Sequence, residues 1–124
     1  MQIKESAENY LEAILVLKRK KGYVRSIDIA NELHVTKPSV SVAMKHFREE
    51  GLITAAPDGA ILLTEKGQAI AERVYARHQT IAAALLLMGV SEETAYEDSC
   101  KIEHDISEET FLRLREYVER HSEK

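Results

Sequence analysis

The fold is decided by Arg25-Ser-Ile-Asp-Ile-Ala-Asn-Glu-Leu33, followed by His34-Val-Thr36 and Lys37-Pro-Ser-Val-Ser-Val-Ala-Met-Lys45. The first segment predicts a short helix with Ser26 as its N-cap. Thr36 is suited to cap a further helix over residues 37–50, because the proline at its second position is tolerated in a first turn. A short helix, a three-residue turn and a capped helix predict a helix-turn-helix.

The flanking sequence extends this motif to a winged helix. Residues 5–20 carry apolar side chains at three- and four-residue spacing, which predicts a preceding helix. Residues 51–64 contain two short β-prone runs around Pro57-Asp-Gly59, which predicts a hairpin, the wing. A helical bundle with an incidental hairpin is the alternative, but the order of elements favours a DNA-binding domain over residues 1–63.

The predicted DNA-contacting residues lie on the two helices and their caps. They are Arg25, Ser26, Thr36, Lys37, Pro38, Ser39, Ser41, Val42 and Lys45. Between Lys37 and Phe47 there is no Arg, Asn or Gln. We therefore expect sequence discrimination to rest on serine hydroxyls, on contact of Val42 with a thymine methyl, and on DNA shape.

Residues 64–124 predict a helical second lobe. Thr64 should cap a long helix that reaches about Met88, and Ser91 a helix that runs through Cys100 to about Ile106. Ser107 should start the last helix. Residues 80–88 are almost wholly apolar, so we expect that end of the long helix to be buried all round, in the subunit or against a partner. The predicted fold class is mainly α, with domains 1–63 and 64–124.

The charge and composition are typical of a globular intracellular protein. The formal net charge is −4, but residues 1–63 carry about +1 and residues 64–124 about −5. Local positive charge is what meets phosphates, so an acidic total does not exclude DNA binding. The single cysteine excludes an internal disulfide framework and fits a reducing cytoplasm. The apolar run from Ile81 to Val90 is too short to span a bilayer, so we expect no membrane association.

A possible metal site is indicated by Cys100-Lys-Ile-Glu103-His104. Residues three and four apart share one face of a helix, so a thiol, a carboxylate and an imidazole would project together. Any one of these residues alone is more often structural: a lone cysteine is usually a small buried hydrophobe. Their joint spacing, together with His78 on a separate predicted helix, favours a transition-metal site.

The winged helix, the run Ala76-Arg77-His78 and the stretch from Cys100 to Ser107 resemble the diphtheria-toxin-repressor family of metalloregulators. The resemblance covers almost the whole chain, and the short length is closer to the manganese transport regulator branch, without an SH3-like domain. It implies a dimeric repressor that binds an operator in double-stranded DNA when loaded with Fe(II) or Mn(II).

The resemblance also implies the metal ligands. They are Asn9, Glu12, His78, Cys100, Glu103 and His104. Asn9 departs from the family, which has Asp or Met there, and Cys100 follows the iron branch where the manganese branch usually has Glu. Ala82 stands where the iron branch has an acid of its ancillary metal site. The mixed N, O and S donors suit Fe(II) first and Mn(II) second, and Zn(II), Co(II) or Ni(II) in vitro.

We therefore interpret the chain as a metal-dependent DNA-binding regulator, a repressor of Fe(II) or Mn(II) uptake genes. In this interpretation the metal acts as co-repressor by fixing the geometry of a homodimer. Three alternatives stay open. One is a metal-independent winged-helix regulator with a small-molecule or Cys100 redox switch. A metalloenzyme is less favoured, because no acid/base pair or nucleophile motif accompanies the cluster. A pure interaction module would leave the ligand set unexplained.

Overall fold

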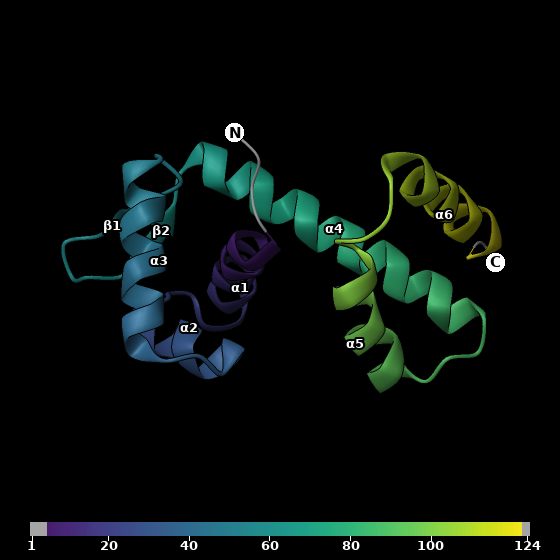
Figure 1. The fold of residues 1–124 in the computed structure, drawn as a ribbon, viewed down its shortest axis with the longest axis horizontal. Coiled ribbons are helices and arrows are strands. Elements are labelled where there is room, and N and C mark those ends of the chain that lie inside the picture. The colour runs from purple at the N-terminus through teal and green to yellow at the C-terminus, as the bar shows by residue number, and fades with distance from the viewer. Residues whose placement is uncertain (1–4, 123–124) are drawn as a thin grey trace. The chain divides into compact units, whose positions relative to one another are not determined.

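Six helices and a two-stranded hairpin make up residues 5–122, the part of the chain that the computed structural model describes. In chain order these are α1 (Glu5–Lys21), α2 (Ser26–Leu33), α3 (Lys37–Glu49), β1 (Ile53–Ala55), β2 (Ile61–Leu63), α4 (Glu65–Leu87), α5 (Glu92–Ile102) and α6 (Glu108–His121) (Figure 1). They belong to two compact units, Met1–Arg73 and Val74–Lys124. The predicted mainly helical class with a small hairpin is confirmed.

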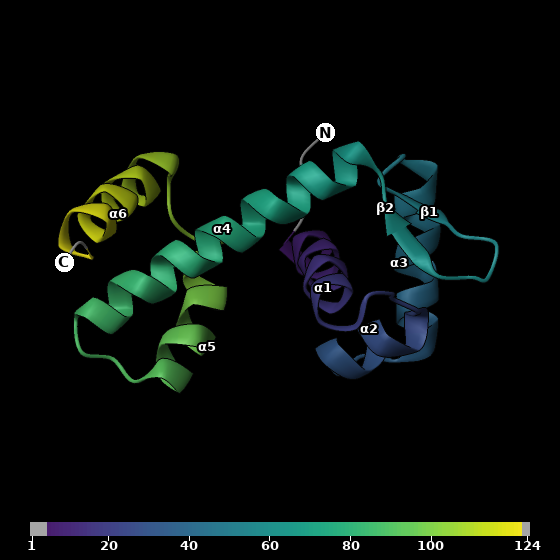
Figure 2. The same ribbon diagram turned by 180° about the vertical axis from the view of Figure 1, so that it is seen from behind.

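The first unit contains the predicted helix-turn-helix. His34 ends α2 in the left-handed conformation (φ 57°), which turns the chain sharply toward α3. Thr36 caps α3 as predicted: its Oγ1 accepts a hydrogen bond from the Ser39 N–H at 3.2 Å. From both sides, α1, α2 and α3 lie together with the hairpin (Figure 2). The helix order and the caps therefore place α3 as the recognition helix of a winged helix-turn-helix.

The predicted N-cap of α2 was wrong by one residue. Arg25 takes the extended cap conformation, and Ser26 is already the first helical residue. The Asp28 carboxylate accepts the Arg25 N–H at 2.9 Å and a hydrogen bond from Lys21 Nζ at 2.6 Å. The hydrogen bond from Lys21, and to a smaller extent that from the Arg25 N–H, lowers the pKa of Asp28. The hydrogen bond between Lys21 and Asp28 also raises the pKa of Lys21. The acid three residues after the cap, rather than a cap hydroxyl, starts this helix.

The core of the first unit is apolar and comes from every element in it. Its fully buried members include Leu11, Ile14, Leu15, Val24, Ile29, Val40, Leu52 and Ile53. The wing is antiparallel, with Ile53 paired to Leu63 and Ala55 to Ile61. Burying such side chains contributes on the order of 1.5–3 kcal/mol each, so this core holds the recognition helix in place.

The start of α4 packs closely against the backbone at Leu52 in the first unit. The Thr64 N–H donates to the Leu52 carbonyl at 3.0 Å, and Thr64 Oγ1 accepts from the Gly67 N–H, the predicted cap. A Cβ on Gly67 would lie 2.0 Å from the Leu52 oxygen, so only glycine fits there. Ion pairs from Arg73 to Glu8 (3.5 Å) and from Arg19 to Glu72 (3.6 Å) tie this part of α4 to α1.

The second unit consists of the rest of α4 together with α5 and α6. Val74, Ile81, Ala84, Ala95 and Phe111 are buried in it. Ser91 and Ser107 cap α5 and α6 as predicted, accepting the N–H groups of residues 94 and 110. However, α5 ends at Ile102 and not near Ile106, and residues 103–105 form a turn.

The apolar end of α4 is only partly covered. Ile81 and Ala84 are buried, but Leu86, Leu87 and Met88 are 44%, 43% and 73% exposed in the single chain. The expectation that this end is buried all round within the subunit is therefore wrong, and the alternative of burial against a partner remains. Among residues 5–122, no helix combines the length and the apolar character needed to cross a membrane.

Candidate metal centre and nucleic-acid interface

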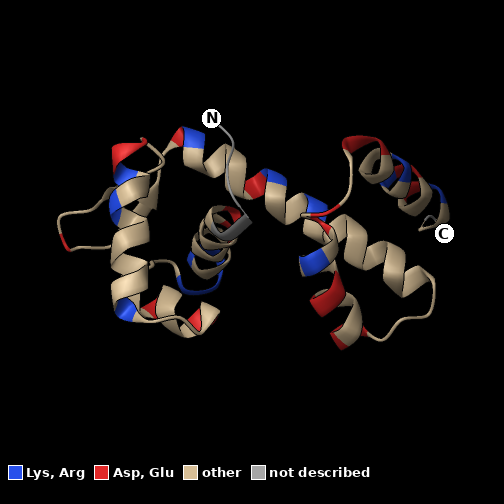
Figure 3. Ribbon diagram, viewed as in Figure 1, with Lys and Arg blue, Asp and Glu red and all other residues tan. Residues whose placement is uncertain are grey.

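The recognition helix presents a basic and hydroxyl-bearing surface. Lys37, Ser41 and Lys45 follow each other at four-residue spacing and are exposed, so they share one face of α3. Val42 is 58% exposed, so its methyl groups are accessible on the surface of α3. Figure 3 shows the Lys and Arg residues at both ends of α3. This face carries the cations and apolar contact that a major-groove helix needs.

Other predicted DNA-contacting residues are engaged within the first unit. The Thr36 and Ser39 hydroxyls bond each other at 2.9 Å as part of the cap. Arg25 donates from Nη1 to the Asp58 carbonyl in the wing turn at 3.0 Å, and its guanidinium lies 3.9 Å from the Asp58 carboxylate. Arg25 therefore connects the turn of the wing to the start of α2. Arg48, which is not among the predicted DNA-contacting residues, is also exposed. Its helical spacing places it on the same face of α3 as Lys37 and Lys45.

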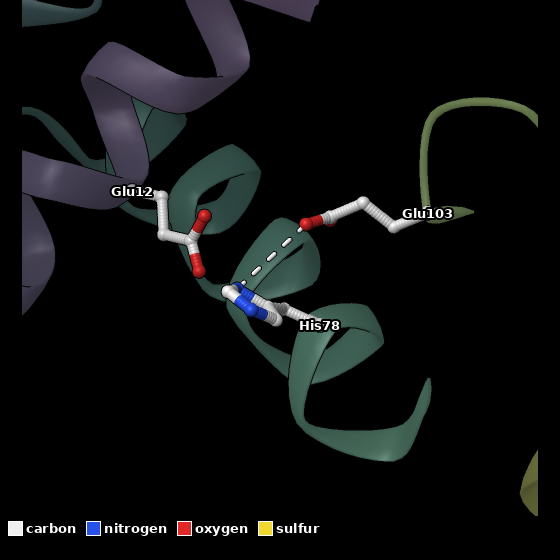
Figure 4. Close-up of side chains that lie close together, drawn as sticks. All are labelled: Glu12, His78 and Glu103. Carbon is white, nitrogen blue, oxygen red and sulfur yellow. Dashed lines mark ion pairs between the residues drawn. The ribbon is translucent and has the colours of Figure 1, made fainter. Parts of the chain in front are cut away.

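In the second unit, His78 lies close to two other predicted metal ligands, Cys100 and Glu103. His78 projects from α4 and is 2% exposed, Cys100 comes from α5, and Glu103, 5% exposed, follows the end of α5. His78 Nε2 lies 3.2 Å from Cys100 Sγ. His78 Nδ1 lies 3.7 Å from Glu103 Oε1, the pair joined by the dashed line in Figure 4. Glu12, also drawn in Figure 4, belongs to the first unit.

The surroundings of His78 suit one tautomer for metal binding. Nε2 lies 3.3 Å from the Tyr96 carbonyl, which can only accept, so a neutral ring with the hydrogen on Nε2 can donate it there. The lone pair is then on Nδ1, which faces Glu103. An imidazole that donates one N–H to a backbone carbonyl and offers the other nitrogen is the usual arrangement of a histidine ligand. The tilted Tyr96 ring, 4.6 Å from the imidazole centroid, also restrains it.

The donor set fits a divalent transition metal. Metal–ligand bonds of about 2.0–2.3 Å place two ligand atoms of one tetrahedral ion roughly 3.3–3.8 Å apart. Nδ1 of His78 lies 3.7 Å from Glu103 Oε1 and 3.8 Å from Cys100 Sγ. A carboxylate in an apolar interior needs a compensating positive charge, which a shared cation would supply. The chemistry of these donors, and the spacing of His78 Nδ1 from each of the other two atoms, therefore fit the implied metal.

The remaining predicted ligands are His104, Asn9 and Glu12. Because α5 ends at Ile102, His104 is not on the helical face of Cys100 but in the following turn, half-buried. Glu103 keeps a helical backbone as the C-cap (φ −59°, ψ −24°), so the helical turn that starts at Cys100 still includes it. Asn9 and Glu12 are half-buried on α1, three residues apart and on one face of that helix.

One contact of the cluster could not be found from motif spacing. Arg77, next to His78, donates from Nη2 to the carbonyl of Glu103 at 3.1 Å. The first unit has capped helices and a wing, and the second has a buried imidazole, a buried carboxylate and a half-buried thiol. Together these features define a metal-dependent DNA-binding transcriptional regulator.

Comparison with known proteins agrees with this class. Residues 2–61 match the iron-dependent repressor N-terminal DNA-binding domain, and residues 64–124 match the iron-dependent repressor metal-binding and dimerisation domain. The chain belongs to the iron-dependent repressor family. This is a family of DNA-binding regulators and not of enzymes.

Individual relatives are similar over most of the chain. The transcriptional regulator MntR of Escherichia coli O157:H7 is 36% identical over 121 residues, covering 98% of this chain and 78% of that protein. The HTH-type transcriptional regulator MntR of Geobacillus kaustophilus is 35% identical over 114 residues, covering 92% and 81%. The crystal structure of T. acidophilum IdeR superposes with a TM-score of 0.80 at 31% identity, over 94% of this chain and 55% of that chain. This chain thus spans little more than half of that solved protein.

Proposed function

We propose that this protein is a repressor of metal-uptake genes whose operator affinity is controlled by Fe(II), with Mn(II) as the second candidate. The observation that carries the proposal is the buried His78, whose Nδ1 lies 3.7 Å from Oε1 of the buried Glu103 and 3.8 Å from Sγ of the half-buried Cys100. The Cys100 thiolate favours Fe(II), because softer ligands discriminate against Mn(II). A regulator that reads DNA in this way acts in the cytoplasm.

The ligand set is completed, on this proposal, by residues around the cluster. His104 supplies a second imidazole from the turn after α5, and Glu12 supplies a carboxylate from α1. Asn9, one turn before Glu12, offers a neutral amide oxygen. Because Glu12 and Asn9 belong to the DNA-binding unit, ligation by them would join that unit to the second one.

Such a link gives the metal its regulatory effect. When loaded, the ion supplies positive charge that allows the Glu12 and Glu103 carboxylates to share one site. The two units are then held in one arrangement, and in a twofold dimer this sets the distance between the two α3 helices. Palindromic half-sites need a separation of about 34 Å or a multiple of it. Metal thereby favours the DNA-competent arrangement among those that the chain samples.

The dimer surface in this proposal is the exposed apolar end of α4. Leu86, Leu87 and Met88 lie there, and the half-exposed Tyr96 of α5 lines the same shallow groove as Leu86. The matched domain is one of dimerisation, and a second copy of this chain would cover these side chains. The metal-independent redox alternative is not favoured, because the family is metal-dependent and His78 has no role in it.

The direct test is anaerobic fluorescence anisotropy with a duplex from the promoter region of the protein's own gene. Protein is titrated at fixed salt in chelator, Fe(II), Mn(II) or Mg(II). We expect Fe(II) and Mn(II) to tighten binding about 5–150-fold, the usual range of allosteric coupling, and Mg(II), which prefers all-oxygen octahedral sites, to leave it at the chelator value. Equal affinity in chelator and in both transition metals would refute the proposal. A random-sequence duplex measures the non-specific background.

A further inference from the structure

Arg77 occupies a position in the second unit where three elements meet. It comes from α4 immediately before His78, and its side chain is only 15% exposed. Its guanidinium donates from Nη2 to the Glu103 carbonyl at 3.1 Å and from Nη1 to the Glu108 carboxylate at 3.1 Å. It also lies over the Phe111 ring, 4.5 Å from the centroid. One side chain therefore contacts the segment that carries Glu103 and the first turn of α6.

The bond to Glu103 has a specific structural consequence. The Glu103 carbonyl would accept an N–H four residues later if α5 continued. Here the Arg77 guanidinium takes that carbonyl, and the chain turns over residues 103–105 before Ser107 starts α6. The position of the Glu103 backbone, and with it the aim of its carboxylate at His78 Nδ1, is thus set partly by Arg77.

The contacts with α6 are as specific. Glu108 is in the first turn of α6, and Phe111 is the buried residue of that helix. Cation–π contact and a charge-assisted bond to the same short segment hold the start of α6 against α4. The fork of a guanidinium can serve the Glu103 carbonyl and the Glu108 carboxylate at once, which a lysine ammonium on one stem does less well.

We propose that Arg77 is a positioning residue of the metal centre: it fixes Glu103 for ligation and couples metal binding to the docking of α6. This inference rests on the proposed function, since it takes Glu103 to be a metal ligand. It adds that metal occupancy is felt in α6, a helix that holds none of the expected ligands. By linkage, a well-docked α6 in turn tightens metal binding.

The test uses the full chain and Co(II) alone as a spectroscopic probe. Arg77→Met keeps an apolar stem over Phe111 but removes both hydrogen bonds. We expect its Co(II) affinity to fall about 10–100-fold, the usual effect of losing a group that orients a metal ligand, with altered Co(II) absorption bands. Hydrogen exchange gives the second readout: Co(II) should slow exchange at the first turn of α6 in the wild type and not in Arg77→Met.

Two further variants separate positioning from general stability. Arg113→Met removes an arginine that is 72% exposed and pairs with Glu116 within α6, so it should match the wild type in both readouts. Arg77→Lys should fall between the wild type and Arg77→Met, and it carries the test if Arg77→Met does not fold. Glu108→Gln removes only the ion pair and should cost no more than about fivefold in affinity.

The outcomes are decisive for the inference. Unchanged Co(II) affinity in Arg77→Met, or metal-induced slowing of α6 exchange that persists in it, would overturn the proposal, as would an Arg77→Lys protein equal to the wild type in both. Failure of the proposed function gives a different result, because the wild type itself would then bind Co(II) without any change in operator affinity.

Discussion

Replacing His78 with glutamine should abolish the metal response of DNA binding. The substitution removes the Nδ1 donor that lies 3.7 Å from Glu103 Oε1 and 3.8 Å from Cys100 Sγ. Loss of a residue that merely orients a ligand costs about 10–100-fold in metal affinity, so loss of the ligand itself should cost more than about 100-fold. Operator affinity of His78→Gln in Fe(II) or Mn(II) should therefore equal that of the wild type in chelator.

The matched control for this variant is His121→Gln. His121 ends α6 in an exposed position, stacked on Tyr117 with ring centroids 4.0 Å apart, and it is remote in sequence from the cluster. It should keep the full metal response. Circular dichroism checks that His78→Gln is folded, because the substituted side chain is almost completely buried. A folded His78→Gln protein with the wild-type metal response would remove His78 from the metal centre.

Replacing Cys100 with glutamate should shift the metal preference from Fe(II) toward Mn(II). The change exchanges a soft thiolate for a hard carboxylate of the kind that Mn(II) accepts, at a position that already lies against the His78 ring. We expect the ratio of Fe(II) to Mn(II) affinity to fall at least about tenfold, equivalent to about 1.4 kcal/mol. Anaerobic titration of each metal, read by operator anisotropy, measures this ratio.

Two controls identify the cause of such a shift. Lys101→Glu changes the charge at the neighbouring exposed position without adding a group to the cluster, so it should leave the ratio unchanged. Cys100→Ser removes the thiolate without adding a carboxylate, and it should weaken Fe(II) more than Mn(II). If Cys100→Glu keeps the wild-type ratio, the thiol does not set the metal preference and is part of the packing around His78.

Much of the fold could be predicted because its signals are local. Thr36, Ser91 and Ser107 cap their helices as the sequence indicates, since a hydroxyl at the cap needs only the N–H three residues later. The wing follows from two short β-prone runs around the Pro57–Gly59 turn. The start of α2 was misplaced because the Arg25 N–H bonds to Asp28, so the decisive group was the acid and not the serine.

One contact at the end of α5 could not be predicted, because its partners are distant in sequence. Arg77, 26 residues earlier, donates to the carbonyl of Glu103, the C-cap of that helix. The exposure of Leu86, Leu87 and Met88 could not be predicted from the apolar pattern either. An apolar run has the same sequence whether its own chain or a partner covers it.

The candidate site was predicted in part. Residue type and spacing indicated His78, Cys100 and Glu103, and the structure places His78 close to each of the other two, while their role as metal ligands stays a prediction. The assumption of one helical face for His104 was wrong, because the helix ends before it. The roles of Asn9 and Glu12, of His104 and of the residues expected to contact DNA stay predictions. Arg77 and the Tyr96 carbonyl emerged only from the packing of α4 against α5 and α6.

The central claim is that metal binding and DNA binding are coupled in one molecule, and reciprocity gives its most direct test. Fe(II) affinity is measured anaerobically by competition with a chelator of known affinity, once for the free protein and once with the promoter duplex at saturation. We predict that the duplex tightens Fe(II) binding by the same factor, about 5–150-fold, by which Fe(II) tightens DNA binding. The same Fe(II) affinity with and without DNA would contradict the account.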